Sequence, residues 1–116
     1  MADISLAVVW NKIHSLSCQT VYTLDQHVKN EILDFGANGM RRHSERKKKP
    51  SFVPRQKFEA VWEKLKKDGK CQRNKRVAPS IVYACLAHLE CIEYSLKPET
   101  LWLSENRHPF GEVKER

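Results

Sequence analysis

The spacing of apolar residues switches between helical and strand-like along this chain, and that order restricts the fold more than any other feature. Apolar residues recur at helical spacing over roughly 4–17, where Asp3 is suited to cap the first turn. Two strands are predicted at 20–25 and 30–35, followed by a Gly-Ala-Asn-Gly turn signal at 36–39. Residues 40–46 would return as a third strand. Because only one of them is apolar, we expect this strand at an edge or facing solvent.

The second half of the sequence predicts a helix, a basic connection, another helix and a hairpin. Pro54 suits the first turn of a helix and Gly69 suits its end, and the apolar stripe between them consists of Phe58, Val61, Trp62 and Leu65. A polar connection over 71–77 leads to a second helix over 79–90. Alternating apolar residues on both sides of a turn at 97–99 then predict a β-hairpin.

Length and composition favour one α+β domain. The chain has 116 residues, of which 41% are apolar and 30% charged, as in globular proteins. We expect a compact domain over 1–104, with a helix and β-meander at 4–46, a basic linker at 47–53, a second half at 54–104, and a frayed tail at 105–116. No apolar run reaches the ~20 residues of a membrane-spanning helix.

The N-terminus and the cysteines predict a cytoplasmic protein. The chain begins with an acidic residue at position 3 and no basic segment, so neither a secretory signal nor a transit peptide is expected. Four cysteines occur without any Cys-x-x-Cys pair, and we interpret them as reduced thiols.

Positive charge is concentrated in one region of the sequence. The formal charge is +7, but residues 41–76 alone hold fifteen Lys and Arg against four Asp and Glu. Such a cluster is sufficient for contacts with nucleic-acid phosphates, and DNA is favoured over RNA as the partner. The residues proposed to bind are Arg41, Arg42, Arg46, Lys47, Lys48, Lys49, Arg55, Lys67, Lys70, Arg73, Lys75 and Arg76. The alternative to nucleic-acid binding is that these residues form a solvated surface that keeps the protein soluble.

The order of elements over 54–104 resembles a winged-helix module, a helix-turn-helix variant with a β-hairpin wing. In that family the second main helix enters the major groove, which implies such a role for 79–90. Two features depart from the pattern. The middle helix would have to fit into 71–76, and the second helix is poor in the Arg and Asn that read bases, so a core helix is the stronger expectation.

Residues 20–104 are also similar to small uncharacterised modules that accompany restriction and mobile-element proteins. The resemblance is carried by Tyr22-Thr23-Leu24-Asp25-Gln26, Asn30-Glu31-Ile32, Ser44-Glu45-Arg46, Val53-Pro54-Arg55 and the stripe Phe58, Trp62 and Leu65. It implies a DNA-transaction context and no particular activity.

Catalytic and metal-binding patterns are weak. Asp34, Glu45 and Lys47 form a trio of the kind that holds Mg²⁺ in restriction-type nucleases, but Glu-x-Lys arises by chance in a lysine-rich chain. The pairs His14/Cys18 and Cys85/His88 have helical spacing, yet the tight cysteine knuckles of structural zinc sites are missing. Cysteine nucleophiles at Cys71 or Cys85 are discounted because thiols on an apolar helix face are inert. We therefore predict no catalytic residue, no metal and no cofactor.

The leading hypothesis is a non-catalytic protein that binds duplex DNA through residues 41–76, as an accessory or regulator in a bacterial or phage DNA transaction. One alternative is a small interaction or inhibitor protein that docks on an acidic surface of a defence or nucleic-acid-processing protein. A second is a minimal Mg²⁺-dependent nuclease. Trp102 points opposite to Leu101 and Leu103 in its strand, so it is either an interface residue or covered by a neighbouring element.

Overall fold

A computed structural model describes residues 6–89 and 92–103 of the chain. The first part contains helix α1 (Leu6–Ile13), a 3-10 turn (His14–Leu16), and strands β1 (Thr20–Tyr22), β2 (Lys29–Phe35), β3 (Gly39–Ser44) and β4 (Ser51–Pro54). The second part contains helix α2 (Arg55–Asp68), β5 (Lys70–Gln72), α3 (Ser80–Leu86), β6 (Ile92–Ser95) and β7 (Thr100–Leu103). The predicted tail at 105–116 lies outside the described residues, as do the first two residues of the predicted 4–17 helix.

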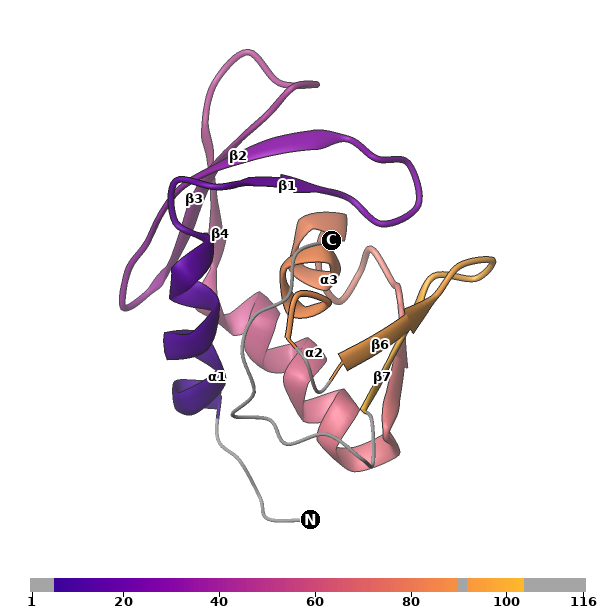
Figure 1. Cartoon of the computed structure of the whole chain (residues 1–116). Helices are drawn as coiled ribbons and strands as arrows, with labels where there is room; N and C mark the ends of the chain where they lie inside the picture. Colours follow the sequence, from indigo (N-terminus) through magenta and orange to yellow (C-terminus); the bar gives the residue numbers. More distant parts are fainter. Residues whose placement is uncertain (1–5, 90–91, 104–116) are drawn as a thin grey trace.

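The strands form two antiparallel sheets, which confirms the α+β class. β1 to β4 pair in sequence order, and the second sheet has the order β5-β7-β6. Helix α3 lies between the β1–β2 layer and α2 (Figure 1). Trp10 of α1 packs edge-on against Phe35 and Phe58, and its indole Nε1 donates a 2.9 Å hydrogen bond to the Gly36 carbonyl. This bond fixes α1 to the turn between β2 and β3.

Strand β3 is an interior strand, so the expected edge position was wrong, although one of its side chains, Arg41, faces solvent. It pairs with β2 on one side and with β4 on the other. The four-residue β4 was not predicted, because its Ser-Phe-Val-Pro sequence follows a lysine run that was interpreted as a linker through residue 53. Alternation puts Met40 and Ser44 on the buried face of β3 and leaves Arg41 exposed.

Helix α3 is surrounded by the rest of the protein. Every residue from Ile81 to Leu89 is buried. This confirms a core helix and leaves α3 no exposed face with which to enter a DNA groove. Between α2 and α3, the described chain forms strand β5 and a turn at the place where a winged helix would have its middle helix. The winged-helix arrangement is therefore not confirmed.

Other predicted boundaries agree closely with the structure. Helix α2 follows Pro54 and ends at Gly69, which adopts a left-handed conformation with φ of 76° and donates its N–H to the Leu65 carbonyl at 2.8 Å. The hairpin of β6 and β7 pairs Glu93 with Trp102, and it places the Trp102 ring 40% exposed. Trp62, in contrast, is 1% exposed in the core.

Because Trp62 and Trp102 differ in burial, their replacement by alanine is predicted to lower the free energy of unfolding by different amounts. Trp62→Ala should lower the free energy of unfolding by about 3–5 kcal/mol, because it leaves a large cavity in the core. Trp102→Ala should cost less than about 1 kcal/mol, since the ring is half in solvent. Urea unfolding of both variants measures the difference. Equal losses would place Trp102 in the core and withdraw it as an interface residue.

Candidate nucleic-acid interface

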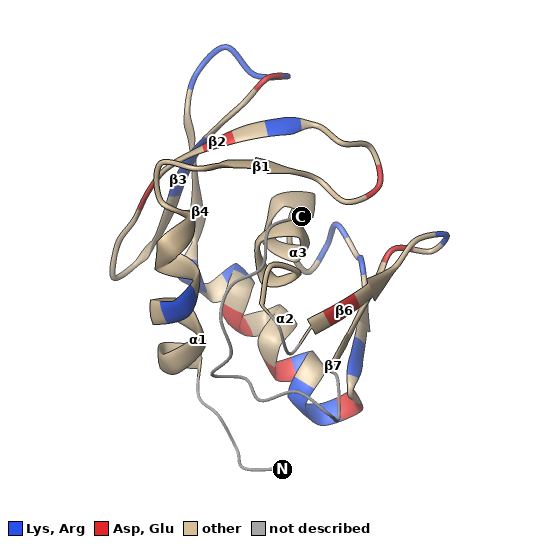
Figure 2. Ribbon diagram, in the orientation of Figure 1, with Lys and Arg blue, Asp and Glu red and all other residues tan. Residues whose placement is uncertain are grey.

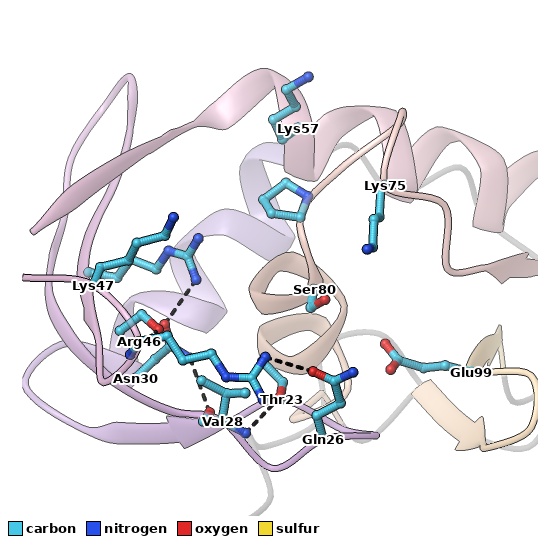
Figure 3. A pocket seen from close by; sticks show the side chains of 13 residues that line it. Thr23, Gln26, Val28, Asn30, Arg46, Lys47, Lys57, Lys75, Ser80 and Glu99 are labelled. Carbon is cyan, nitrogen blue, oxygen red and sulfur yellow. Dashed lines mark hydrogen bonds between the residues drawn. The ribbon is translucent and has the colours of Figure 1, made fainter.

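A cavity of about 410 Å³ lies between the first sheet and the second half of the chain. The inner face of β2 and β3 and the 23–28 turn form one wall. The start of α2, the connection before α3, the first residue of α3 and the hairpin turn form the other. Among the described residues, those that line it include five basic side chains and a single carboxylate: Arg42, Arg46, Lys47, Lys57, Lys75 and Glu99. We call this the cationic cavity (Figure 3).

The sheet wall is built by strand alternation. Asn30 of β2 is opposite Ser44 of β3, and both side chains are buried on the inner face together with Arg42 two residues earlier. Both polar atoms of the Asn30 amide make a hydrogen bond, because Nδ2 donates to the Val28 carbonyl at 3.1 Å and Oδ1 accepts from Arg42 Nη1 at 2.9 Å. The Asn30 amide thus holds the Arg42 guanidinium in place at the cavity wall.

Arg42 carries a hydrogen-bond donor without a partner. Its Nε is buried and makes no hydrogen bond. Burial lowers the pKa of the Arg42 guanidinium, because a charged group loses its hydration inside the protein. A buried donor left unpaired costs about 1–3 kcal/mol, so an acceptor that reached Arg42 Nε would recover this energy.

Four more cations stand around the opening. Arg46 and Lys47 begin the turn after β3, and Arg46 Nη1 donates to Gln26 Oε1 at 2.8 Å across to the 23–28 turn. Lys57 is in the first turn of α2, and Lys75 is in the connection before α3. Figure 3 shows Lys57 and Lys75 across the cavity from Arg46 and Lys47. Positive side chains therefore approach the same space from three separate segments of the chain.

Glu99 supplies the negative group of the cavity. It lies just before β7 and is 5% exposed. Its Oε1 is 3.7 Å from Arg73 Nε, while its Oε2 is buried without a hydrogen-bond partner. Burial raises the pKa of the Glu99 carboxyl, and the nearby Arg73 charge offsets only part of this shift. Arg73 also donates from Nη1 to Ser80 Oγ at 3.1 Å, so its guanidinium contacts two residues of the cavity wall, Glu99 and Ser80.

The structure brings together part of the set that the sequence predicted. Arg42, Arg46, Lys47 and Lys75 line the cationic cavity. Lys48 and Lys49 continue the same turn after Lys47, and both are exposed. Figure 2 shows this basic turn after β3 and a second basic segment before α3. Arg76 belongs to that second segment and is exposed.

The remaining predicted residues lie outside the lining of the cavity. Arg41 forms a close ion pair with Asp34, which raises the pKa of Arg41 and lowers that of Asp34. Arg55 lies over the Trp10 ring at 5.6 Å, and Lys70 lies over the Trp102 ring at 5.4 Å. Lys67 is in the last turn of α2, about 15 Å along the helix from Lys57.

Two charged residues of the cavity, Lys57 and Glu99, were not among the site residues proposed from the sequence. Lys57 falls within the basic region, but nothing in the local pattern distinguishes it from the other lysines of α2. Glu99 follows a proline turn, and only its burial against Arg73 marks it as unusual.

The geometry argues against a shared carboxylate site for the suggested nuclease trio. Asp34 pairs in register with Arg41, whereas Glu45 follows the other end of β3, about 13 Å farther along the strand. Glu45 Oε1 instead accepts a hydrogen bond from the Lys29 backbone N–H at 3.2 Å.

The geometry of the described residues also gives no support for a metal site or a cysteine nucleophile. Within residues 6–89 and 92–103, no group of three His, Cys, Asp or Glu side chains is placed to hold a metal ion. Cys18 is exposed, whereas Cys85 is buried, and burial raises the pKa of the Cys85 thiol to about 12. At neutral pH the Cys85 thiol is therefore protonated and a poor nucleophile.

Comparison with protein-family models, curated proteins and solved structures yields no match to this chain. In the described part of the chain, no helix has the length and apolar character needed to cross a membrane.

The raised pKa of Glu99 predicts a pH-dependent effect of its replacement. The Glu99 carboxyl has a higher pKa in the folded state than in the unfolded state, so the folded state binds its proton more tightly. The free energy of unfolding therefore falls as pH rises from below the unfolded-state pKa to above the folded-state pKa. Glu99→Gln removes this titration. The stability of the variant relative to the unmodified protein should therefore increase between pH 4 and pH 7, as measured by urea unfolding at both values.

Glu59→Gln, an exposed carboxylate on α2, is the matched control for this experiment. A stability difference for Glu99→Gln that did not change with pH would show that Glu99 is hydrated and outside the buried wall.

Proposed function

We propose that the chain binds nucleic acid through the cationic cavity and the basic segments on either side of its opening. The observation that carries the proposal is the lining itself, in which cations from the β3 turn, α2 and the connection before α3 surround one space. Like charges held near one another repel, and a polyanion relieves that repulsion. Binding would also release counterions from the nucleic acid, which favours association at moderate salt.

The proposed surface is smaller than the full 41–76 region. Arg41 is neutralised by Asp34, and Arg73 is engaged by Glu99 and Ser80. The exposed turn Lys47–Lys49 and the exposed Lys75 and Arg76 remain available for phosphates. We propose that a duplex lies across the opening, with backbone contacts from the turn on one side and from the connection on the other. Contacts of this kind give affinity that depends little on sequence.

A non-catalytic accessory role in DNA transactions is the form of this function that we favour. Apart from Glu99 and the apolar Val28 and Pro79, the residues around the cavity are cations, amides and hydroxyls, which are suited to holding a backbone. The alternative partner is a protein with an acidic surface. It would use the same cations, and it is distinguished from DNA by the outcome of the experiment below.

The proposal predicts that Lys57 and Lys75 contribute more to the affinity for a duplex than two lysines outside the cavity do. Lys57→Gln combined with Lys75→Gln should weaken binding to a duplex about tenfold or more at moderate salt, because both cations line the cavity. The slope of log K against log salt should also decrease in magnitude by about two, one for each lost phosphate contact. Fluorescence anisotropy with a labelled duplex measures both quantities.

The matched control is Lys12→Gln combined with Lys67→Gln, which removes the same charge from α1 and from the far end of α2. This pair should leave the salt slope almost unchanged. Equal weakening by both pairs would mean that only net charge matters and that the cavity is not the footprint. Absence of duplex binding by the unmodified chain at low salt would reject the nucleic-acid proposal and favour the acidic protein partner.

A further inference from the structure

The cationic cavity has a feature that a phosphate backbone alone does not explain. Its wall includes Glu99, a buried carboxylate whose Oε2 has no hydrogen-bond partner. DNA backbone groups are acceptors only, so a backbone beside Glu99 would meet a second acceptor and a like charge. Glu99 Oε1 already faces Arg73 Nε at 3.7 Å, so Oε2 is the oxygen that lacks a donor, and in DNA the donors are on the bases.

Cations stand on both sides of the cavity, but the carboxylate is on one side only. Figure 3 shows Glu99 on the hairpin side, across from Arg46 and Lys47, with Ser80 between them. Lys75 stands on the same side as Glu99, so a ligand that fills the cavity needs negative charge for the cations and, beside Glu99, a hydrogen-bond donor. The unpartnered Nε of Arg42 adds a need for an acceptor at the sheet wall. A nucleotide has this combination, because its phosphate is anionic and its base edge carries both donors and acceptors.

The size of the cavity restricts the ligand to a single unit. At about 410 Å³ it is near the lower end of the range, roughly 300–1,000 Å³, for sites that take small molecules. A duplex is too wide to enter it. The Watson–Crick edge of a paired base is already occupied by its partner strand, so only an unpaired base offers Glu99 the donors of that edge.

Apolar and planar groups in the lining suit the faces of a base. Val28 and Pro79 provide apolar surface. The Arg46 guanidinium is held by Gln26, which orients a flat cation toward the same space. Bases drawn out of a duplex are held in this way, between apolar or planar side chains and by hydrogen bonds to their Watson–Crick edge.

We infer that the cationic cavity receives one unpaired nucleotide, whose phosphate contacts the cations at the opening and whose base donates a hydrogen bond to Glu99. This inference rests on the proposed nucleic-acid binding and makes it more specific. The same nucleotide chemistry is available from a free mononucleotide and from an unpaired position in a strand, and the experiment separates these sources.

The experiment compares duplexes that differ at one central position. The full chain is titrated with a fully paired duplex, a duplex with one mismatch and a duplex with one abasic site, and separately with a mononucleotide and deoxyribose 5-phosphate. We expect the mismatched duplex to bind at least about tenfold more tightly than the paired one, because less unpairing is required. It should also bind at least about tenfold more tightly than the abasic one, which has no base to place against Glu99.

Ser80→Phe tests whether the preference depends on the cavity, since a phenyl ring at this position would fill it. The ratio of mismatched to paired affinity should fall to near one. Ser15→Phe, at an exposed serine next to α1, is the matched control and should keep the ratio. The comparison of duplexes on the unmodified chain needs no variant, so it decides the inference even if Ser80→Phe fails to fold.

The outcomes separate this inference from the function on which it rests. Equal binding of all three duplexes overturns the nucleotide inference and leaves nucleic-acid binding standing. Binding of the mononucleotide above deoxyribose 5-phosphate, without any mismatch preference, assigns the cavity to free nucleotides and overturns capture from a strand. Absence of binding to every duplex and to the mononucleotide rejects both proposals.

Discussion

Complete burial of helix α3 is the constraint on which the rest of the structure depends. A helix that is apolar on every side has to be covered on every side, and residues Ile81–Leu89 are all buried. The first sheet covers α3 from above, and α2 covers it from below in the view of Figure 1. The polar residue Ser80 stands at the N-terminal end of α3, where it follows Pro79. The apolar surface of α3 ends there, and the cationic cavity lies beside this end of the helix.

The same constraint explains why charges that are distant in the sequence lie close together. Arg42 and Lys75 are separated by more than thirty residues, but the sheet and the connection before α3 both pass the same end of α3. Asn30 and Gln26 then hold Arg42 and Arg46 through hydrogen bonds of 2.9 Å and 2.8 Å. Positive groups fixed in this way lose little further freedom when an anion binds, which favours binding. In the protein without a bound ligand, this arrangement leaves a hydrogen-bond donor of Arg42 and an acceptor of Glu99 without partners, which lowers the stability of the fold.

Much of the fold was predictable because local patterns decide it. The stripe around Trp62, the stop at Gly69 and the alternation that exposes Trp102 all follow from backbone periodicity, and the structure confirms each of them. Strand β4 was not predictable in the same way. It exists because β3 offers it a free edge, and its own four residues, next to a lysine run, carry too little pattern to indicate a strand.

The candidate site was predictable only as a region. Regional charge indicated Arg42, Arg46, Lys47 and Lys75, but it could not exclude Arg41, whose pairing with Asp34 depends on the β2–β3 register. Lys57 and Glu99 enter the site through tertiary packing alone, since neither belongs to a distinctive local pattern. Charge density in a sequence thus predicts that a polyanion is a suitable partner, whereas packing determines which cations face it.

The central claim is that the cationic cavity, rather than the basic region as a whole, contacts nucleic acid. It is tested most directly by mapping amide chemical-shift changes on the isotope-labelled chain as a short duplex is added. The account predicts that the largest shifts occur at Gln26, Ser44, Lys57, Lys75 and Glu99, which come from five separate segments around the cavity. Shifts confined to the Lys47–Lys49 turn, or centred on Lys67 and Trp102, would contradict it.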